Sequence, residues 1–279
     1  MAVLSYPKMN LDRIITGMVA MGDPLYYEMA KISAQAFVRE NSCDLALFTD
    51  KPEYFAGMKD YGRLKIVDYN TWFNKGKDIF AVFDQKIEHG RADFPYYDHF
   101  HLHLYIGAFI PMLQWYAEEN GYDWCLKIDS DSYFVGDMFA KLRTECQEWA
   151  YLKDFFSVSQ CHPEMCFFHE GGMPTAGFMM WRVKSWYCER YIVGFTVNEQ
   201  QTYWNRMNDG EYLRHFVLQH PGYHFVYPFG KNEHFTKENA MKFLPAYFHL
   251  GGTNLIKQVQ LMDKWFNPES QFTLTDWRG

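Results

Sequence analysis

Short apolar segments alternate with segments of helical length through the first half of the chain. The short segments are rich in β-branched and aromatic residues and are followed by turn residues, which is typical of strands. Between the first two, apolar residues recur at helical spacing, as Leu25, Met29 and Ile32 do. The pattern predicts strands at 13–16, 44–49, 64–67 and 124–128 and helices at 25–37 and 97–119. This order predicts an α/β fold with a mainly parallel, Rossmann-like sheet flanked by helices, whose ligands bind beyond the carboxyl ends of the strands.

The second half of the chain has a more mixed pattern. We predict strands at 155–159, 177–181 and 223–227 and helices at 184–195, 211–218 and 255–262. We find no internal repeat, low-complexity tract or Pro/Gly/Ser-rich linker in the sequence. We therefore predict a single domain over residues 1–279.

Composition narrows the class of partner. Among the 279 residues, hydrophobic (48%) and charged (22%) shares are those of an ordinary globular protein, whereas the aromatic share of 19% is high. Clefts that bind sugars or nucleotides use such flat side chains, and so do Tyr-rich cores and subunit interfaces. The formal net charge of −7 argues against nucleic acid as a partner, because no basic surplus is available to displace counterions from its backbone.

The sequence predicts no membrane span and no secretory leader. Its most apolar stretch, 105–117, contains Pro111 and Gln114 and is shorter than the roughly 20 apolar residues that a span requires. The six cysteines are scattered: Cys43, Cys125, Cys146, Cys161, Cys166 and Cys188. We therefore expect a reducing, cytoplasmic compartment, with a luminal enzyme whose anchor was removed as the alternative.

Two carboxylates follow the predicted strand at 124–128. Asp129 and Asp131 lie one residue apart where this apolar strand ends. Carboxylates this close repel each other unless a hard cation lies between them. Mg²⁺ and Mn²⁺ accept oxygen ligands and keep positions open for phosphate oxygens, so the pair is a candidate metal–diphosphate site. Asp-Ser-Asp is also common turn chemistry after a strand, and that alternative stays open.

The order of motifs along the chain resembles that of GT-A fold glycosyltransferases, and most closely the retaining galactosyl- and xylosyltransferase-type families. The segments that carry the resemblance are Arg13-Ile-Ile-Thr-Gly17, Asp129-Ser-Asp-Ser-Tyr-Phe-Val-Gly-Asp-Met138, Thr175-Ala-Gly-Phe-Met-Met-Trp-Arg182, Asn208-Asp-Gly-Glu211 and Phe248-His-Leu-Gly251. The resemblance covers about 13–264. It implies a nucleotide-binding half at about 1–135 and an acceptor-binding half at 136–279.

Such an enzyme would move one sugar, a hexose or xylose, from a nucleotide-diphosphate donor to a hydroxyl of a glycan or glycoprotein acceptor. The resemblance favours UDP as the nucleotide and retention over inversion at the sugar. It implies that Asp129, Asp131 and His249 hold one divalent cation. We expect Mn²⁺ rather than Mg²⁺, because a nitrogen ligand joins the oxygens. A histidine buried among Tyr247, Phe248 and Leu250 in the core is the alternative for His249.

The resemblance also implies catalytic and binding residues. Asp209 and Glu211 are the candidate catalytic carboxylates, although acidic residues are also favoured at the start of a helix by its dipole. Glu211 departs from the acidic motif of the retaining families, which keeps a catalytically weak carbohydrate-binding relative open as an alternative. The donor-binding candidates are Thr16, Gly17, Asp50, Lys77, Asp129, Gly251 and Lys257. The acceptor-binding candidates are Thr175, Ala176, Gly177, Trp181 and Trp204.

Several candidates have simpler explanations. Thr16 and Gly17 are expected at the end of the first strand, against the nucleotide. Asp50 could reach the base or cap a helix that Pro52 begins, and Lys257 could neutralise a phosphate or lie exposed on its helix. The tryptophans are candidates for stacking on a sugar, with core packing as the alternative.

Two other clusters suggest rival metal sites. His99-Phe-His-Leu-His103 could begin the metal site of a hydrolase if it formed a strand, but we predict a helix there, which scatters the three side chains. Cys161, Cys166 and His169 have a weak zinc-like pattern, and we interpret the segment as a loop near the active site.

Overall fold

The computed structural model describes residues 13–22, 24–58, 62–76, 97–139, 165–170, 173–184, 224–227, 247–249, 255–267 and 269–270. For 97–107, 165–170, 173–176, 224–227, 247–249 and 255 the description covers the backbone alone. The predicted strand at 155–159 and the predicted helices at 184–195 and 211–218 lie outside these residues, apart from Lys184.

A seven-stranded sheet runs through the described residues, with its strands in the order β3-β2-β1-β4-β7-β6-β8. The strands are β1 (Ile14–Ala20), β2 (Asp44–Thr49), β3 (Leu64–Asp68), β4 (Trp124–Ile128), β6 (Met165–Glu170), β7 (Met173–Arg182) and β8 (His224–Tyr227). The first four in spatial order are parallel, β7 is antiparallel to both of its neighbours, and β8 is parallel to β6. The predicted α/β fold with a mainly parallel sheet is confirmed.

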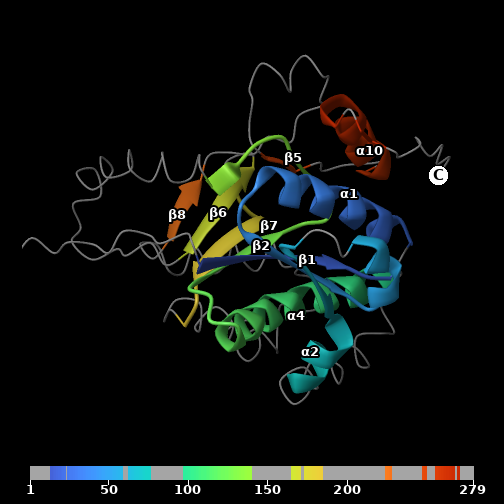
Figure 1. Cartoon of the computed structure of the whole chain (residues 1–279). Helices are drawn as coiled ribbons and strands as arrows, with labels where there is room; N and C mark the ends of the chain where they lie inside the picture. Colours follow the sequence, from blue (N-terminus) through green and yellow to red (C-terminus); the bar gives the residue numbers. More distant parts are fainter. Residues whose placement is uncertain are drawn as a thin grey trace, which may run out of the picture.

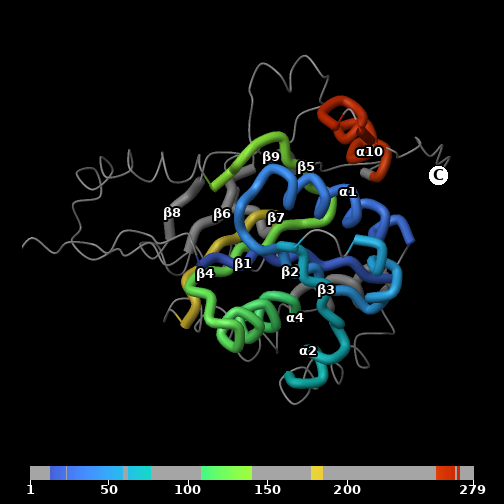
Figure 2. The backbone as a smooth tube through the Cα atoms, in the orientation of Figure 1, coloured from blue at the N-terminus to red at the C-terminus, as the bar shows by residue number. Residues whose placement is uncertain are grey.

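Helices cover both faces of this sheet (Figure 1). Helices α1 (Pro24–Glu40) and α10 (Leu255–Phe266) lie on one side. Helices α4 (Tyr97–Glu119) and α2 (Tyr69–Lys75) lie on the other, and a short 3₁₀ helix, η2 (Pro52–Met58), follows β2. Figure 2 follows the same backbone path and shows α1 lying between the sheet and α10. No helix of the described residues is long and apolar enough to cross a membrane.

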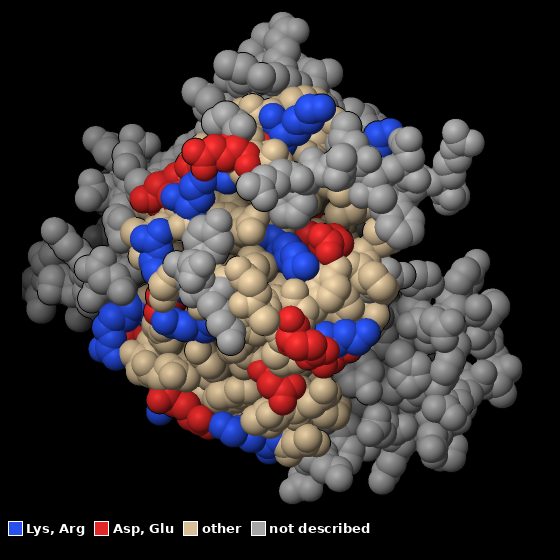
Figure 3. All heavy atoms as spheres, turned by 45° about the vertical axis from the view of Figure 1, so that its right-hand side comes forward, with Lys and Arg blue, Asp and Glu red and all other residues tan. Residues whose placement is uncertain are grey.

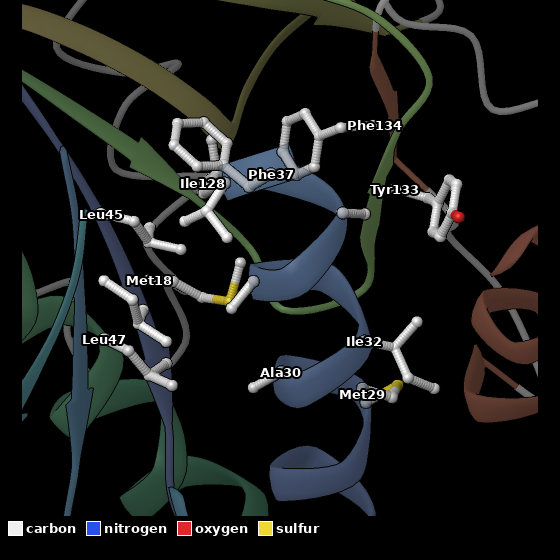
Figure 4. Packing of buried hydrophobic residues seen from close by; sticks show 14 of the residues in the cluster. Met18, Met29, Ala30, Ile32, Phe37, Leu45, Leu47, Ile128, Tyr133 and Phe134 are labelled. Carbon is white, nitrogen blue, oxygen red and sulfur yellow. The ribbon is translucent and has the colours of Figure 1, made fainter. Parts of the chain in front are cut away.

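The α1 side of the sheet has an apolar core. Met18, Leu45 and Leu47 extend from β1 and β2 toward α1, where Ala30 faces them (Figure 4). Apolar residues also lie on the far side of α1, where Ile32 faces α10. This helix therefore buries apolar residues on both sides, which explains why Ile32 has no exposed surface.

The α4 side of the sheet is packed so closely that it excludes a side chain at Gly17. A Cβ atom there would lie 2.5 Å from Leu113 Cδ2 and 2.8 Å from Phe109 Cζ, both on α4. Gly17 therefore allows the helix to approach β1. The interpretation of Gly17 as a turn after a strand ending at Thr16 is wrong, because β1 continues to Ala20.

A second, two-stranded sheet joins distant parts of the chain. Strand β5 (Ser132–Phe134) pairs antiparallel with β9 (Tyr247–His249). The hydroxyl of Tyr133 on β5 donates a hydrogen bond to Asp263 Oδ1 of α10 at 2.9 Å, and Arg39 Nη2 of α1 donates to the same hydroxyl at 3.3 Å. Burial raises the pKa of Tyr133, so its proton stays in place for this bond. This network fixes α10 against α1 beside the end of β4.

Two cysteines of the described residues, Cys43 and Cys125, are free thiols. One predicted loop is in part a strand: β6 (Met165–Glu170) overlaps the Cys161–His169 segment that we interpreted as a loop. Figure 3 shows one face of the molecule, on which described Lys and Arg side chains lie among Asp and Glu side chains. Neither sign of charge forms a continuous field over the described part of that face.

Candidate functional site

The candidate site begins where β4 ends. Trp124–Ile128 is buried along its whole length, and Asp129 follows directly with a side chain that is 33% exposed. The backbone N–H of Asp129 donates to the carbonyl of Gly177 on β7 at 3.2 Å. Asp131 comes after a turn residue and precedes β5. Both predicted carboxylates therefore lie at the carboxyl edge of the sheet, where ligands of open α/β sheets bind.

Lys127 is a site residue that sequence reasoning missed. It lies on β4 opposite Gly17 of β1 and Met179 of β7 and has no exposed side-chain surface. Its Nζ atom lies 2.7 Å from Asp129 Oδ1. Lys127 is the second-last residue of β4 and Asp129 follows the strand directly, so the two side chains are close enough in the chain to meet. The signal available in the sequence was a lysine inside an otherwise apolar strand, two residues before an aspartate.

The register of the small sheet brings the predicted third metal ligand to the same place. Ser132 of β5 is paired with His249 of β9, so the His249 backbone lies opposite the residue that follows Asp131. These positions are more than one hundred residues apart in the sequence. The backbone therefore gathers two carboxylates and one imidazole-bearing residue, a donor set that suits Mn²⁺ or Mg²⁺. Among the residues whose side chains are described, no group of three or more candidate ligands forms a metal cluster.

The predicted acceptor segment runs beside the two aspartates. Thr175, Ala176 and Gly177 lie on β7, next to the β4 end, because Ile128 pairs with Phe178. The Gly177 carbonyl, which accepts from Asp129, fixes this strand against the start of the Asp-Ser-Asp turn. The backbone thus places the predicted acceptor segment and the predicted metal ligands side by side.

Thr16 and Gly17 do not lie at the carboxyl edge. Thr16 is fully buried and its hydroxyl lies 3.6 Å from the Cys43 sulfur, while Gly17 faces α4. Their predicted place at the strand end is wrong, because β1 runs on to Ala20. The turn glycine there is Gly22, whose φ of +84° favours glycine. A Cβ atom at Gly22 would meet no atom of the described residues within 4 Å, so these residues leave space at the end of β1.

Asp50 does lie at this edge. It follows β2 directly, and Thr49 pairs with Ala20 at the end of β1. The hydroxyl of Tyr27 on α1 donates to Asp50 Oδ1 at 2.8 Å. Burial, with this bond to Asp50, raises the pKa of Tyr27. The neutral phenol therefore holds the carboxylate of Asp50 in one orientation beside the end of β1.

Trp181 is a core residue, so the prediction that it stacks on an acceptor sugar is wrong. It has no exposed surface, and its Nε1 donates to Gln114 Oε1 of α4 at 2.8 Å. It pairs with Cys125, far along β4 from Asp129. The alternative of core packing holds for this tryptophan.

The remaining candidates divide into two groups. Lys257 is exposed on α10, which begins at Leu255 as predicted. The others lie outside the described residues: Lys77, Trp204, Asp209, Glu211 and Gly251.

The three residues of the rival histidine cluster, His99, His101 and His103, lie on α4. The helix that we predicted there is confirmed, and it directs residues at this spacing to different sides.

Comparisons with known proteins give likeness in structure alone. No protein-family model and no curated protein matches the chain. Mouse xyloside xylosyltransferase 1 matches with a TM-score of 0.52 and 11% identity, over 87% of this chain and 98% of that one. A glycosyltransferase that takes part in glycosylation of the major capsid of PBCV-1 matches with a TM-score of 0.45 and 14% identity, over 90% and 99% of the two chains.

The bifunctional glycosyltransferase WbbM matches with a TM-score of 0.48 and 14% identity, over 90% of this chain and 48% of that one. At these identities the matches concern the fold alone, and of these three only the match to the mouse enzyme has a TM-score above 0.5. That match covers 87% of this chain, which includes most of the described sheet. The chain has the GT-A-like α/β fold of a glycosyltransferase.

Proposed function

We propose that this protein is a metal-dependent glycosyltransferase that moves one sugar from a UDP-sugar to a hydroxyl of a glycan acceptor, with retention at the sugar. One observation carries the proposal: the register Ser132↔His249 brings the backbone of His249 next to Asp131 and the Asp129 strand end. If Asp-Ser-Asp were only a turn, nothing would require a histidine from a distant segment beside it. Two carboxylates and one imidazole are, in contrast, a donor set that holds a divalent cation well.

The residues of the chain divide the work among them. Asp129, Asp131 and His249 hold the cation, and Asp50, oriented by Tyr27, lies on the nucleoside side at the end of β1 and β2. Thr175, Ala176 and Gly177 line the sugar and acceptor side. A divalent cation bound here supplies positive charge to the diphosphate as it leaves. Asp209 and Glu211 remain the predicted carboxylates at the reacting sugar.

The reaction exchanges one bond for another. The bond from the anomeric carbon to the diphosphate oxygen breaks, and the acceptor hydroxyl oxygen bonds to the same carbon. The hydroxyl proton passes to the departing diphosphate oxygen or to solvent, and UDP is released. The sugar is a hexose or xylose. Xylose heads the test series, since the matching mouse protein is a xyloside xylosyltransferase.

Release of UDP tests the proposal without a known acceptor, because transferases hydrolyse their donor slowly in water. The full chain is incubated with UDP-xylose, UDP-glucose or UDP-galactose and Mn²⁺, with and without EDTA. We expect UDP release from one donor, and its loss in EDTA. Turnover that persists unchanged in EDTA contradicts metal dependence. Absence of both turnover and Mn²⁺-dependent UDP binding contradicts the enzyme and favours a carbohydrate-binding relative.

A further inference from the structure

Lys127 is a positive charge enclosed in the apolar interior. Its neighbours on the same side of the sheet, Cys125 and Met179, belong to the cluster packed against α4. Enclosing a cation without a partner costs several kcal/mol, so a fully buried lysine needs a specific reason to be kept. One partner of Lys127 is Asp129, at 2.7 Å.

The described part of the chain contains a useful contrast. Lys75 and Glu119 form an ion pair of similar length, 2.8 Å, but their side chains are 43% and 55% exposed. Water screens that pair on both sides, so its charges act weakly on their surroundings. Lys127 is fully enclosed, and its field is therefore screened far less.

The position of Lys127 has a consequence for any cation bound by Asp129. A divalent ion held by that carboxylate would be close to the Lys127 ammonium, since both would contact the same small group. The ammonium repels the ion and offsets part of the negative charge that attracts it. The diphosphate of a nucleotide brings further negative oxygens and restores the attraction.

We propose that Lys127 offsets the charge of Asp129, so that the site binds a bare divalent cation weakly and binds it tightly only together with the nucleotide diphosphate. This inference rests on the proposed function. Lys127 is a positioning residue that acts through Asp129 and does not touch the substrate. The expected result is cooperative binding of Mn²⁺ and UDP, each raising the affinity for the other by the same factor.

The test is a titration of the chain with Mn²⁺, carried out with and without UDP. Binding is measured as the loss of the free Mn²⁺ signal in electron paramagnetic resonance. For the wild-type chain we expect UDP to raise Mn²⁺ affinity by about tenfold to 100-fold. Lys127→Met removes the charge and the hydrogen bond, and Lys127→Gln removes the charge but keeps a donor. We expect both variants to bind Mn²⁺ alone about tenfold more tightly than wild type does. UDP should then raise their Mn²⁺ affinity by a smaller factor than in wild type.

Lys75→Met is the matched control, because it breaks an ion pair far from this site and should change neither value. The proposal is overturned if Lys127→Met weakens Mn²⁺ binding while Lys127→Gln behaves as wild type, since the hydrogen bond then matters and the charge does not. It is also overturned if wild type binds Mn²⁺ equally well with and without UDP, a result that needs no variant to fold. Failure of the proposed function is distinct: wild type then binds no Mn²⁺ in either condition, or Asp131→Asn binds it as well as wild type.

Discussion

The two sides of β4 are built from different kinds of residue. Trp124, Leu126 and Ile128 enter the apolar cluster around α1. On the α4 side lie Cys125 and Lys127, and the charge of Lys127 continues to Asp129 at the strand end. One strand of five residues therefore has a side for packing and a side that leads to the candidate site.

The contrast shows how polar groups enter a packed interior. On the α4 side, Trp181 donates to Gln114 at 2.8 Å and Lys127 contacts Asp129 at 2.7 Å. These two buried polar side chains, Trp181 and Lys127, each have a partner, so the interior bears them without a large loss of stability. We therefore expect substitutions on the α1 side to change stability alone, and substitutions of Lys127, Asp129 or Asp131 to change binding and turnover.

The largest effect is expected for Asp131→Ala. Loss of a metal ligand should reduce turnover by on the order of 10³-fold, while the melting temperature stays close to that of wild type, because Asp131 is partly exposed. Steady-state UDP release and calorimetry measure the two quantities. Glu119→Ala, which removes an exposed carboxylate elsewhere, is the control. Turnover of Asp131→Ala equal to that of wild type would contradict the assignment of Asp131 to the candidate site.

On the packing side, Leu126→Ala should lower the free energy of unfolding by about 2–5 kcal/mol, because a fully buried side chain leaves a cavity in the α1 cluster. Urea unfolding gives this value. UDP release per folded molecule should remain within about twofold of wild type. A loss of stability below about 1 kcal/mol, or a turnover defect as large as that of Asp131→Ala, would contradict this assignment.

A smaller effect is expected for Gly17→Ala, which tests how closely α4 approaches β1. The added methyl group meets Leu113 at 2.5 Å, and the overpacking should cost about 1–3 kcal/mol of unfolding free energy. Leu113→Ala removes the side chain that the added methyl group meets. The double variant should therefore lose less unfolding free energy than the sum of the losses in the two single variants. Simple additivity in this double-mutant cycle would mean that Leu113 is not the obstacle.

The smallest expected effect is a change with pH in the stability that the Cys43 thiol contributes. Burial raises the pKa of Cys43 to about 12 from an ordinary value of 9.0. The unfolded chain loses this proton above about pH 9, whereas the folded chain keeps it to about pH 12, so this contribution to stability is lost as pH rises through that window. The stability advantage of wild type over Cys43→Ala should therefore shrink between pH 8.5 and 10.5, as thermal melting measures. An advantage that does not change with pH would contradict the raised pKa of the Cys43 thiol.

Local patterns were enough to predict much of the sheet. β2 and β4 have the predicted bounds, and α4 spans Tyr97–Glu119 as expected, because their apolar runs are continuous and end at clear turn signals. The end of β1 was misplaced because Gly17 has two explanations, a turn or a close helix, and only the position of α4 decides between them. β6 was missed since Met165–Glu170 mixes apolar residues with His169 and Glu170.

The candidate site was predictable in part. Asp129 and Asp131 follow a strand in the sequence itself, so their place at the carboxyl edge needed no long-range information. The pairing of Ser132 with His249 depends on a strand register between distant segments, which a resemblance in motif order indicated but no local pattern fixes. Lys127 was missed because the burial of a charge depends on its partner in space. Trp181 was assigned to the acceptor site because a sequence does not distinguish a tryptophan in the core from one that stacks on a sugar.

Crystals of the full chain grown with Mn²⁺ and UDP give the most direct measurement, an anomalous difference map at the manganese absorption edge. We predict one strong peak at the carboxyl edge of β4, within ligand distance of Asp131, His249 and the diphosphate. A peak elsewhere, or UDP bound at this edge with the side chains of Asp129, Asp131 and His249 turned away from one another, would contradict the account.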